Sequence, residues 1–363
     1  MKKGICLLLA ALLALGCFGL SGCSGEDTVT ITVYNWGQYM ARGEDGCIDV
    51  IALFEEAYPG IKVNYVTVED NETLYTKLKN GGISVDVIIP SDYMIARLIS
   101  EDMLLPLNYD NIPNYSYIND DLKGMYYDPD ELYSVPYTWG TVGIIYNTKY
   151  VSTEEVEEKG WGILWEESYS DKILMFSNSR DAFGIACYLL GYDVNTTDTD
   201  ELNACAALLA EQKSLVQQYV MDQVFSLMEG EEAWIAPYYA GDYLTMAESN
   251  EDLAFYRPTE QGFNRFVDAM CIPSCAEHQE EAELFINFVT DPEIMAGNME
   301  YVYYSAPADA AKAYMDEDMA SDPVSYPSEE DLASATFFAL LPDETTRYVE
   351  DLFIQIRAGS YTG

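Results

Sequence analysis

The chain has 363 residues, which exceeds what one simple hydrophobic core requires and predicts about two domains. Apolar residues make up 49% of it, which is enough for a packed globular protein. The formal net charge of −44 at pH 7 argues against nucleic acid and anionic membrane surfaces as partners and suits the attraction of cations. For most of the 62 acidic residues we expect no role beyond a solvated acidic coat.

The N-terminus is typical of a bacterial export signal. Lys2 and Lys3 precede an apolar run from Ile5 to Leu20, and Leu20-Ser21-Gly22-Cys23 looks like a lipoprotein cleavage box. An ordinary signal peptide with a chance cysteine is the alternative, but the polar tether that follows the box favours the lipoprotein. We therefore predict a signal peptide over residues 1–22, a tether over 23–27, and a lipid on Cys23 that anchors the protein outside the cytoplasm without spanning the membrane.

The cysteines and the single histidine limit the chemistry. Five cysteines remain beyond Cys23, so at most two internal pairs can form, and we predict no disulfide, although Cys271–Cys275 and Cys187–Cys205 stay open. His278 is the only histidine and lies in a polar run, which disfavours Ser-His-Asp catalysis and excludes zinc sites with several histidines. No catalytic residue, metal or cofactor is expected.

The first third of the chain alternates strands and helices, the pattern of a doubly wound parallel sheet. β-branched and aromatic residues alternate over 28–34 and indicate a first strand, which leads into the turn-prone Asn35-Trp36-Gly37. A Trp at the carboxyl end of such a strand lies where open α/β sheets bind ligands. The elements expected next are a helix over 48–58, a strand over 61–68, a helix over 72–79 capped by Asp70-Asn71, a strand over 85–89 and a helix from Pro90 to about Met103.

The remaining chain predicts a second group of elements and two extended crossings. Residues 107–130 are rich in turn formers, and 133–146 is a long extended segment that could cross between two lobes. Residues 266–273 are extended again and would return the chain to the first lobe. Between and after the crossings we expect a helix or turn at 161–165, a strand over 172–176, helices over 181–190 and 202–218, a strand over 233–239, a helix from 240–242 and a helix over 281–289.

A set of short strings, in order and spacing, resembles the spermidine/putrescine-binding proteins of ATP-driven polyamine importers over nearly all of the mature chain. The strings are Tyr34-Asn35-Trp36 with Tyr39, Pro90-Ser91-Asp92-Tyr93, Val135-Pro136-Tyr137 with Trp139-Gly140, Arg180-Asp181, Gly241-Asp242, Phe266-Val267-Asp268, Ile272-Pro273 and Tyr304-Ser305-Ala306-Pro307. The resemblance implies an α/β fold of the two-lobed periplasmic-binding-protein type (type II-like), in which each lobe is a sheet flanked by helices. Its expected parts are 28–137 plus 269–312 for lobe 1 and 138–268 plus 313–363 for lobe 2, joined by a hinge.

Polyamine chemistry fits the residues that the resemblance assigns. A polyamine carries ammonium groups, which are buried only when paired with carboxylates, and methylene chains, which need apolar walls. Aromatic faces serve both needs, because they also attract cations. By resemblance, the residues expected to bind ligand are Trp36 and Tyr39 as walls, Ser91 and Tyr93 as polar contacts, Asp181, Asp242 and Asp268 as partners of amines, and Tyr239, Phe266 and Tyr304 as further aromatic lining.

Some positions depart from the spermidine type, which leaves the length of the ligand open. Asn178 stands where an acid is common, Tyr239 and Phe266 stand where tryptophan is common, and Phe338-Ala339 lies near the place of a missing glutamine. Structural alternatives also exist for the assigned residues. Asp181 and Asp242 could be helix N-caps, Ser91 could be only a cap, and the rings could belong to the core. The acidic run 154–158 is expected to be a solvated face.

The sequence thus predicts an extracytoplasmic solute-binding lipoprotein, not an enzyme, that captures spermidine or putrescine in an interlobe cleft. It would act as a monomer, deliver its ligand to the permease subunits of an ABC importer, and require no cofactor. A ferric-ion receptor is the first alternative, because Tyr238-Tyr239 and Tyr303-Tyr304 superficially fit paired tyrosine ligands. A carbohydrate receptor and a glycoside hydrolase with paired carboxylates are weaker alternatives, the latter without any supporting motif.

Overall fold

The computed structural model describes residues 28–363. The predicted signal peptide, the tether and Cys23 lie outside the described residues. Within residues 28–363, no helix combines the length and apolar character needed to cross a membrane.

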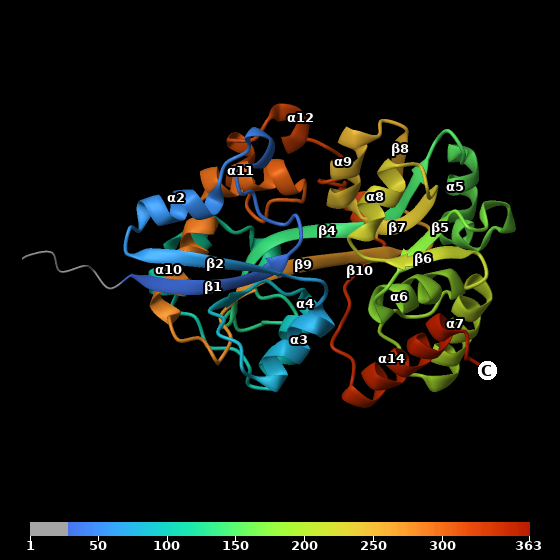
Figure 1. Ribbon diagram of the computed structural model, residues 1–363, viewed down its shortest axis with the longest axis horizontal. Coiled ribbons are helices and arrows are strands. Elements are labelled where there is room, and N and C mark those ends of the chain that lie inside the picture. The colour runs from blue at the N-terminus through green and yellow to red at the C-terminus, as the bar shows by residue number, and fades with distance from the viewer. Residues whose placement is uncertain (1–27) are drawn as a thin grey trace, which may run out of the picture.

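The first lobe begins with the predicted alternation of strands and helices (Figure 1). β1 (Val29–Trp36) pairs in parallel with β2 (Ile61–Val68) on one side and β3 (Val87–Ile88) on the other. The helices α2 (Val50–Ala57), α3 (Asn71–Asn80) and α4 (Asp92–Ser100) follow these strands in turn. The strand ends two residues later than expected, because Asn35 and Trp36, which we predicted to lie in a turn, pair with β2 and extend β1. All three strands point their carboxyl ends toward the middle of the molecule.

Two antiparallel strands connect the halves of the molecule. β4 (Ser134–Asn147) is buried along its whole length and pairs with β9 (Phe263–Cys271). Cys271, at one end of β9, also pairs with Ile88 of β3, whereas the other half of β4 pairs with β7 (Ile235–Tyr239). The two strands therefore run from one sheet into the other, as Figure 1 shows at its centre. These are the two predicted crossings.

The second sheet continues the order β7, β5 (Ile173–Phe176) and β6 (Val216–Val220), all parallel to one another. Its helices are α6 (Ser179–Leu190), α7 (Thr199–Gln212), α8 (Gln223–Glu229) and α9 (Ala240–Ser249). The predicted helix over 202–218 is wrong at its end, because α7 stops at Gln212 and a turn leads into β6. The β-branched and aromatic residues of β6 pair with β5 and override the helical pattern.

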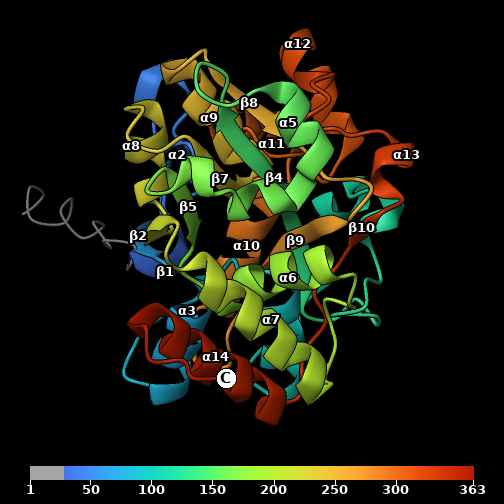
Figure 2. The same cartoon turned by 90° about the vertical axis from the view of Figure 1, so that its right-hand side faces the viewer.

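The remaining elements are helices, helical turns and two further strands, of which β8 (Leu253–Tyr256) pairs with β4 and β10 (Ala335–Thr336) pairs with β9. Between β3 and β4 the turn-rich segment forms the short helical turns η2 (Tyr109–Asn111), η3 (Pro113–Tyr117) and η4 (Asp120–Leu122), and the others are η1 (Glu44–Gly46), α5 (Thr153–Lys159), η5 (Gly160–Trp165), η6 (Glu167–Tyr169), α10 (Gln279–Val289), α11 (Pro292–Val302), η7 (Asp309–Ala313), α12 (Glu317–Ala320), α13 (Glu329–Leu332) and α14 (Asp343–Ala358). α14 packs on α6 and α7, which Figure 2 shows from the side, whereas α12 packs on η7.

Two side-chain expectations can be compared with these elements. The acidic run of α5 is not solvated throughout, because Val156 is buried and Glu155 accepts a hydrogen bond from the Tyr169 hydroxyl at 2.6 Å. The Sγ atoms of Cys187 and Cys205 approach to 3.5 Å between α6 and α7 but remain thiols. Cys271 is buried and Cys275 is exposed, and they also remain thiols.

Candidate ligand-binding site

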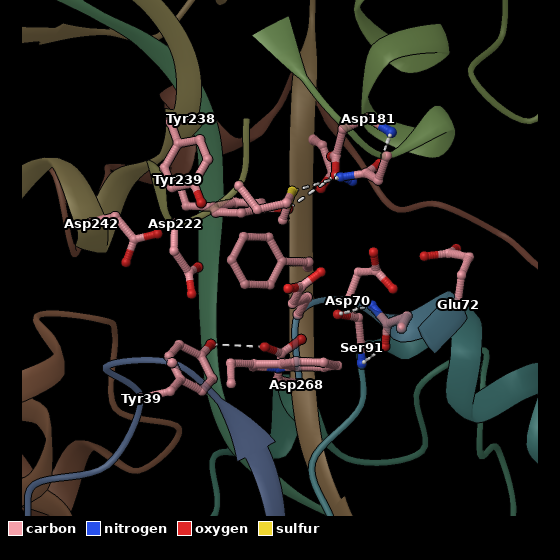
Figure 3. A pocket seen from close by; sticks show the side chains of 18 of the residues that line it. Tyr39, Asp70, Glu72, Ser91, Asp181, Asp222, Tyr238, Tyr239, Asp242 and Asp268 are labelled. Atoms are coloured by element: carbon pink, nitrogen blue, oxygen red, sulfur yellow. Dashed lines mark hydrogen bonds between the residues drawn. The ribbon is translucent and has the colours of Figure 1, made fainter. Parts of the chain in front are cut away.

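A pocket lies between the two sheets, where the carboxyl ends of their parallel strands face each other (Figure 3). Trp36 ends β1, Ser91 follows β3, Asp181 follows β5 and Tyr239 ends β7. The structure brings together in its lining all ten residues assigned from the sequence: Trp36, Tyr39, Ser91, Tyr93, Asp181, Tyr239, Asp242, Phe266, Asp268 and Tyr304. Their roles in binding stay predictions.

Asp268 is the acid placed most centrally. It sits on the crossing strand β9, opposite Thr138 of β4, and its backbone bridges to Ser91. The Tyr39 hydroxyl donates to Oδ2 at 2.8 Å, but the buried Oδ1 has no hydrogen-bond partner within residues 28–363. Burial raises the pKa of Asp268 to about 6, against the opposing effect of the polar groups of Ser91, Tyr39 and Trp36. This carboxylate therefore retains one buried oxygen that accepts no hydrogen bond from the described residues.

Asp181 and Asp242 stand in the first turns of α6 and α9, but neither is an N-cap, so that alternative is wrong. The cap of α6 is Asn178, whose Oδ1 accepts from the Asp181 N–H at 2.8 Å. The same Asn178 side chain donates from Nδ2 to Asp181 Oδ2 at 2.8 Å, and the Tyr239 hydroxyl donates to that oxygen at 3.0 Å. Burial raises the pKa of Asp181. Burial raises that of Asp242 to about 8, where the Tyr304 hydroxyl opposes the shift and nearby carboxylates add to it.

The lobe 1 side of the pocket contains a polar network that also decides the role of Ser91. Ser91 occupies the N-cap position of α4 but makes no capping hydrogen bond, so a cap-only role is wrong. Instead its Oγ accepts from Asn71 Nδ2 at 3.0 Å. The Tyr93 hydroxyl donates to Glu72 Oε1 at 3.0 Å, and burial, with the charge of Asp70 adding to it, raises the pKa of Glu72 to about 7.

The assigned rings pack edge to face along the pocket. Tyr39 meets Tyr304 with ring centroids 5.0 Å apart, and Tyr239 meets Phe266 at 5.4 Å. The Tyr304 ring lies directly on Gly241, where a Cβ atom would come within 2.2 Å of it, so this position requires glycine. The rings form a rigid apolar wall whose faces also attract cations, by roughly 0.5–2 kcal/mol each.

Several lining acids were missed by sequence reasoning. Eight carboxylates line the pocket and no Lys, Arg or His does; besides the three expected ones they are Glu69, Asp70, Glu72, Asp92 and Asp222. The sequence predicted Asp70 only as the N-cap of α3. This role is confirmed, because Asp70 accepts a hydrogen bond from the Thr73 N–H at 2.7 Å. Asn178 and Phe338, noted as departures, also line the pocket. Only Asp92, Asp181 and Asp268 of the eight are buried, but gathering this much like charge in one pocket is unfavourable unless a ligand supplies a cation.

The four tyrosines of the ferric alternative do not come together. Tyr238, Tyr239 and Tyr304 line the pocket, but Tyr303 is absent from the lining and its hydroxyl donates to Glu248. Within residues 28–363, no three His, Cys, Asp or Glu side chains are grouped so as to hold a metal ion.

Comparison with known proteins places this fold and pocket in one class. The family of bacterial extracellular solute-binding proteins matches residues 83–334. The chain therefore belongs to this family, and the predicted class of extracytoplasmic solute-binding protein is confirmed.

Individual relatives match almost the whole chain. The spermidine/putrescine-binding periplasmic protein of Escherichia coli is 29% identical over 97% of this chain and 98% of its own length. The structure of the spermidine/putrescine ABC transporter substrate-binding protein PotD of Streptococcus pneumoniae is similar with a TM-score of 0.76 and 32% identity, over 92% of this chain and 100% of that one. The TpPotD lipoprotein of Treponema pallidum matches with a TM-score of 0.79 and 25% identity, over 91% and 99% of the two chains. These matches confirm the predicted two-lobed fold.

Proposed function

We propose that this protein captures polyamines, spermidine or putrescine, in the pocket between its lobes and delivers them to the permease of an ABC importer. The observation that carries the proposal is the lining of eight carboxylates and no cationic side chain, together with the unpartnered Oδ1 of Asp268. An ammonium group would provide the missing donor and the missing positive charge at once. The relatives named for spermidine and putrescine support the same ligand class.

Two kinds of side chain would bind the ligand: acids that pair with its ammonium groups and rings that enclose its methylene chains. Asp268, which Tyr39 holds in place, would pair with one ammonium group, while Asp181 and Asp242 would serve the remaining amines. Trp36, Tyr239, Phe266 and Tyr304 would enclose the methylene chains, where each buried CH₂ contributes about 0.8 kcal/mol. Ser91 and Tyr93 would add polar contacts from lobe 1.

Calorimetric titration tests the ligand class directly. The purified protein should bind putrescine, spermidine or both, and should give no saturable heat with ferric citrate or with neutral oligosaccharides. Absence of binding to every polyamine, or tight binding of ferric ion with the colour of a tyrosinate complex, would refute the proposal.

We also propose that Cys23 carries a lipid, that the mature protein acts as a monomer, and that lobe 1 comprises 28–137 plus 269–312 and lobe 2 comprises 138–268 plus 313–363. The lipoprotein-like box Leu20-Ser21-Gly22-Cys23 supports the first point. In the Cys23→Ala variant, the protein or its precursor should no longer be labelled when cells are fed a labelled fatty acid. Full retention of the label in that variant would show that the anchor lies elsewhere.

A further inference from the structure

The side chain of Asp222 lines the pocket, but it caps no helix and pairs with no cationic side chain of the described residues. It lies between β6 and α8 at the N-cap position of that helix, yet its side chain makes no capping hydrogen bond. It forms no ion pair with any residue of the described chain. Its place is the solvent-open edge of the pocket lining. A structural role in starting α8 therefore does not explain it.

The carboxylate of Asp222 reaches across the cleft to the backbone of lobe 1. A Cβ atom built on Gly37 would lie 2.7 Å from Asp222 Oδ2, so the acid is seated against this glycine. The φ angle of Gly37 is not in the left-handed region, so a Cβ atom here would displace the Asp222 carboxylate rather than strain the backbone. Because the two residues belong to opposite lobes, Asp222 completes the pocket only when the lobes are together.

Like charges surround Asp222. Partial burial and the charge of Glu69 raise the pKa of Asp222, and Asp222 in turn contributes to the raised pKa of Asp242. Figure 3 shows Asp242 and Asp222 at the left of the pocket, Asp181, Asp70 and Glu72 at the right, and Asp268 below and between them. The labelled carboxylates thus extend along the pocket from Asp222 and Asp242 past Asp268 to the acids at the right.

We propose that Asp222, together with Asp242, binds a third ammonium group and so makes the site selective for linear triamines over diamines. The inference rests on the proposed function, since it concerns which polyamine the same pocket takes. A diamine can pair with carboxylates at two places along this row, whereas a triamine can also reach Asp222 and Asp242 at its end. Asp222 is then the specificity-determining residue at the open edge of the pocket.

Two variants separate the position of this carboxylate from the charge of the protein. Asp222→Asn removes the charge, and Gly37→Ala keeps the charge but displaces the Asp222 side chain. Glu154→Gln is the matched control, because Glu154 is exposed on α5 and the substitution makes the same change in net charge. Each protein is titrated with putrescine and spermidine by calorimetry at physiological salt, where long-range charge effects are screened.

We expect the wild type to bind spermidine more tightly than putrescine. Asp222→Asn and Gly37→Ala should each weaken spermidine binding roughly tenfold, as for one charge-assisted hydrogen bond, and putrescine binding about twofold or less. Glu154→Gln should change neither. Equal losses for the two ligands, or unchanged spermidine binding by Asp222→Asn, would overturn the inference. If the wild type binds no polyamine, the proposed function itself fails, which is a different result.

The thermal stability of the empty protein provides the remaining distinction. If Asp222 is a binding residue among like charges, empty Asp222→Asn should melt at the same temperature as the wild type or higher. A lower melting temperature would assign Asp222 to the stability of α8 and would overturn its role as a binding residue.

Discussion

A carboxylate buried with only half of its hydrogen bonds made is a costly arrangement, and Asp268 is such a group. An ammonium group bound at Asp268 would offset the cost, because the charge pair would form where water is largely excluded. Tyr39 contributes by fixing one oxygen, and the other oxygen is buried without a hydrogen-bond donor among the described residues. This arrangement distinguishes Asp268 from the many acids on the surface.

Replacing Asp268 with Asn should therefore weaken polyamine binding strongly while keeping the shape of the side chain. Loss of one partner of a buried charge pair costs about 2–5 kcal/mol, which corresponds to well over a tenfold loss of affinity. Calorimetric titration checks this, with Glu154→Gln as the control, because Glu155 has the Tyr169 and Lys159 contacts and is not inert. Equal, small losses in both variants would mean that polyamines are held only by diffuse charge.

The raised pKa values predict how the stability of the empty protein depends on pH. Burial raises the pKa of Asp268 to about 6, of Glu72 to about 7 and of Asp242 to about 8. Unfolded Asp and Glu titrate near pH ~4, so the folded state binds these protons more tightly, and the stabilisation that results is complete below pH ~4 and lost as the pH rises through each folded pKa.

The empty protein should accordingly lose stability between about pH 5 and about pH 8, and Asp242→Asn should lose less over the same interval. Thermal unfolding of both proteins across this range measures the difference. Parallel curves for the two proteins would show that Asp242 titrates normally.

At the residue scale, the sequence could predict the acids that carry a local signal and not the others. Asp268 lies in an apolar strand, and Asp181 and Asp242 fall within recognisable strings. Glu69 and Asp222 have no such signal, because they follow edge strands in loops and look like any of the 62 acidic residues. Only the packing of two lobes brings them to one pocket.

The start of α6 combines helix capping with site geometry. Asn178 accepts a hydrogen bond from the backbone of Asp181 and donates another to its carboxylate. Asn178→Ala should lose about 1 kcal/mol of unfolding free energy through the lost cap, and should also bind polyamine more weakly. Asn178→Ser keeps a capping oxygen but not the amide donor, so its stability should recover while its affinity does not. Chemical denaturation and titration measure the two effects, and wild-type affinity in Asn178→Ser would show that the amide donor is unimportant.

Elements were predictable wherever periodicity agreed with packing. The alternation from β1 to α4 is correct in order and type, and so are both crossings. The error at β6 arose because Val216 and its neighbours fit either a helix or an edge strand until the pairing with β5 is known. The exposed acids of α14 likewise gave no sign that its apolar face packs on α6 and α7.

At the scale of the whole molecule, ligand should hold the lobes together. The pocket lining draws acids from both sides, so the closed arrangement places like charges face to face and is disfavoured without a cation. Under the proposed function, a polyamine would contact both lobes only in the closed state and would shift the population toward it. Small-angle X-ray scattering should show a smaller radius of gyration when spermidine or putrescine saturates the protein. An unchanged radius would argue against hinge closure.

The crossing strands have a consequence for how the protein comes apart. β9 pairs with β3 of the first sheet, β4 pairs with β7 of the second, and β4 and β9 pair with each other, so one hydrogen-bonded order runs from β2 through to β6. Melting either lobe therefore removes a partner from this central strand pair, on which the other lobe also depends. Although the proposed hinge closure would move the lobes as two bodies, the lobes should unfold as one cooperative unit, because the paired strands β4 and β9 join them.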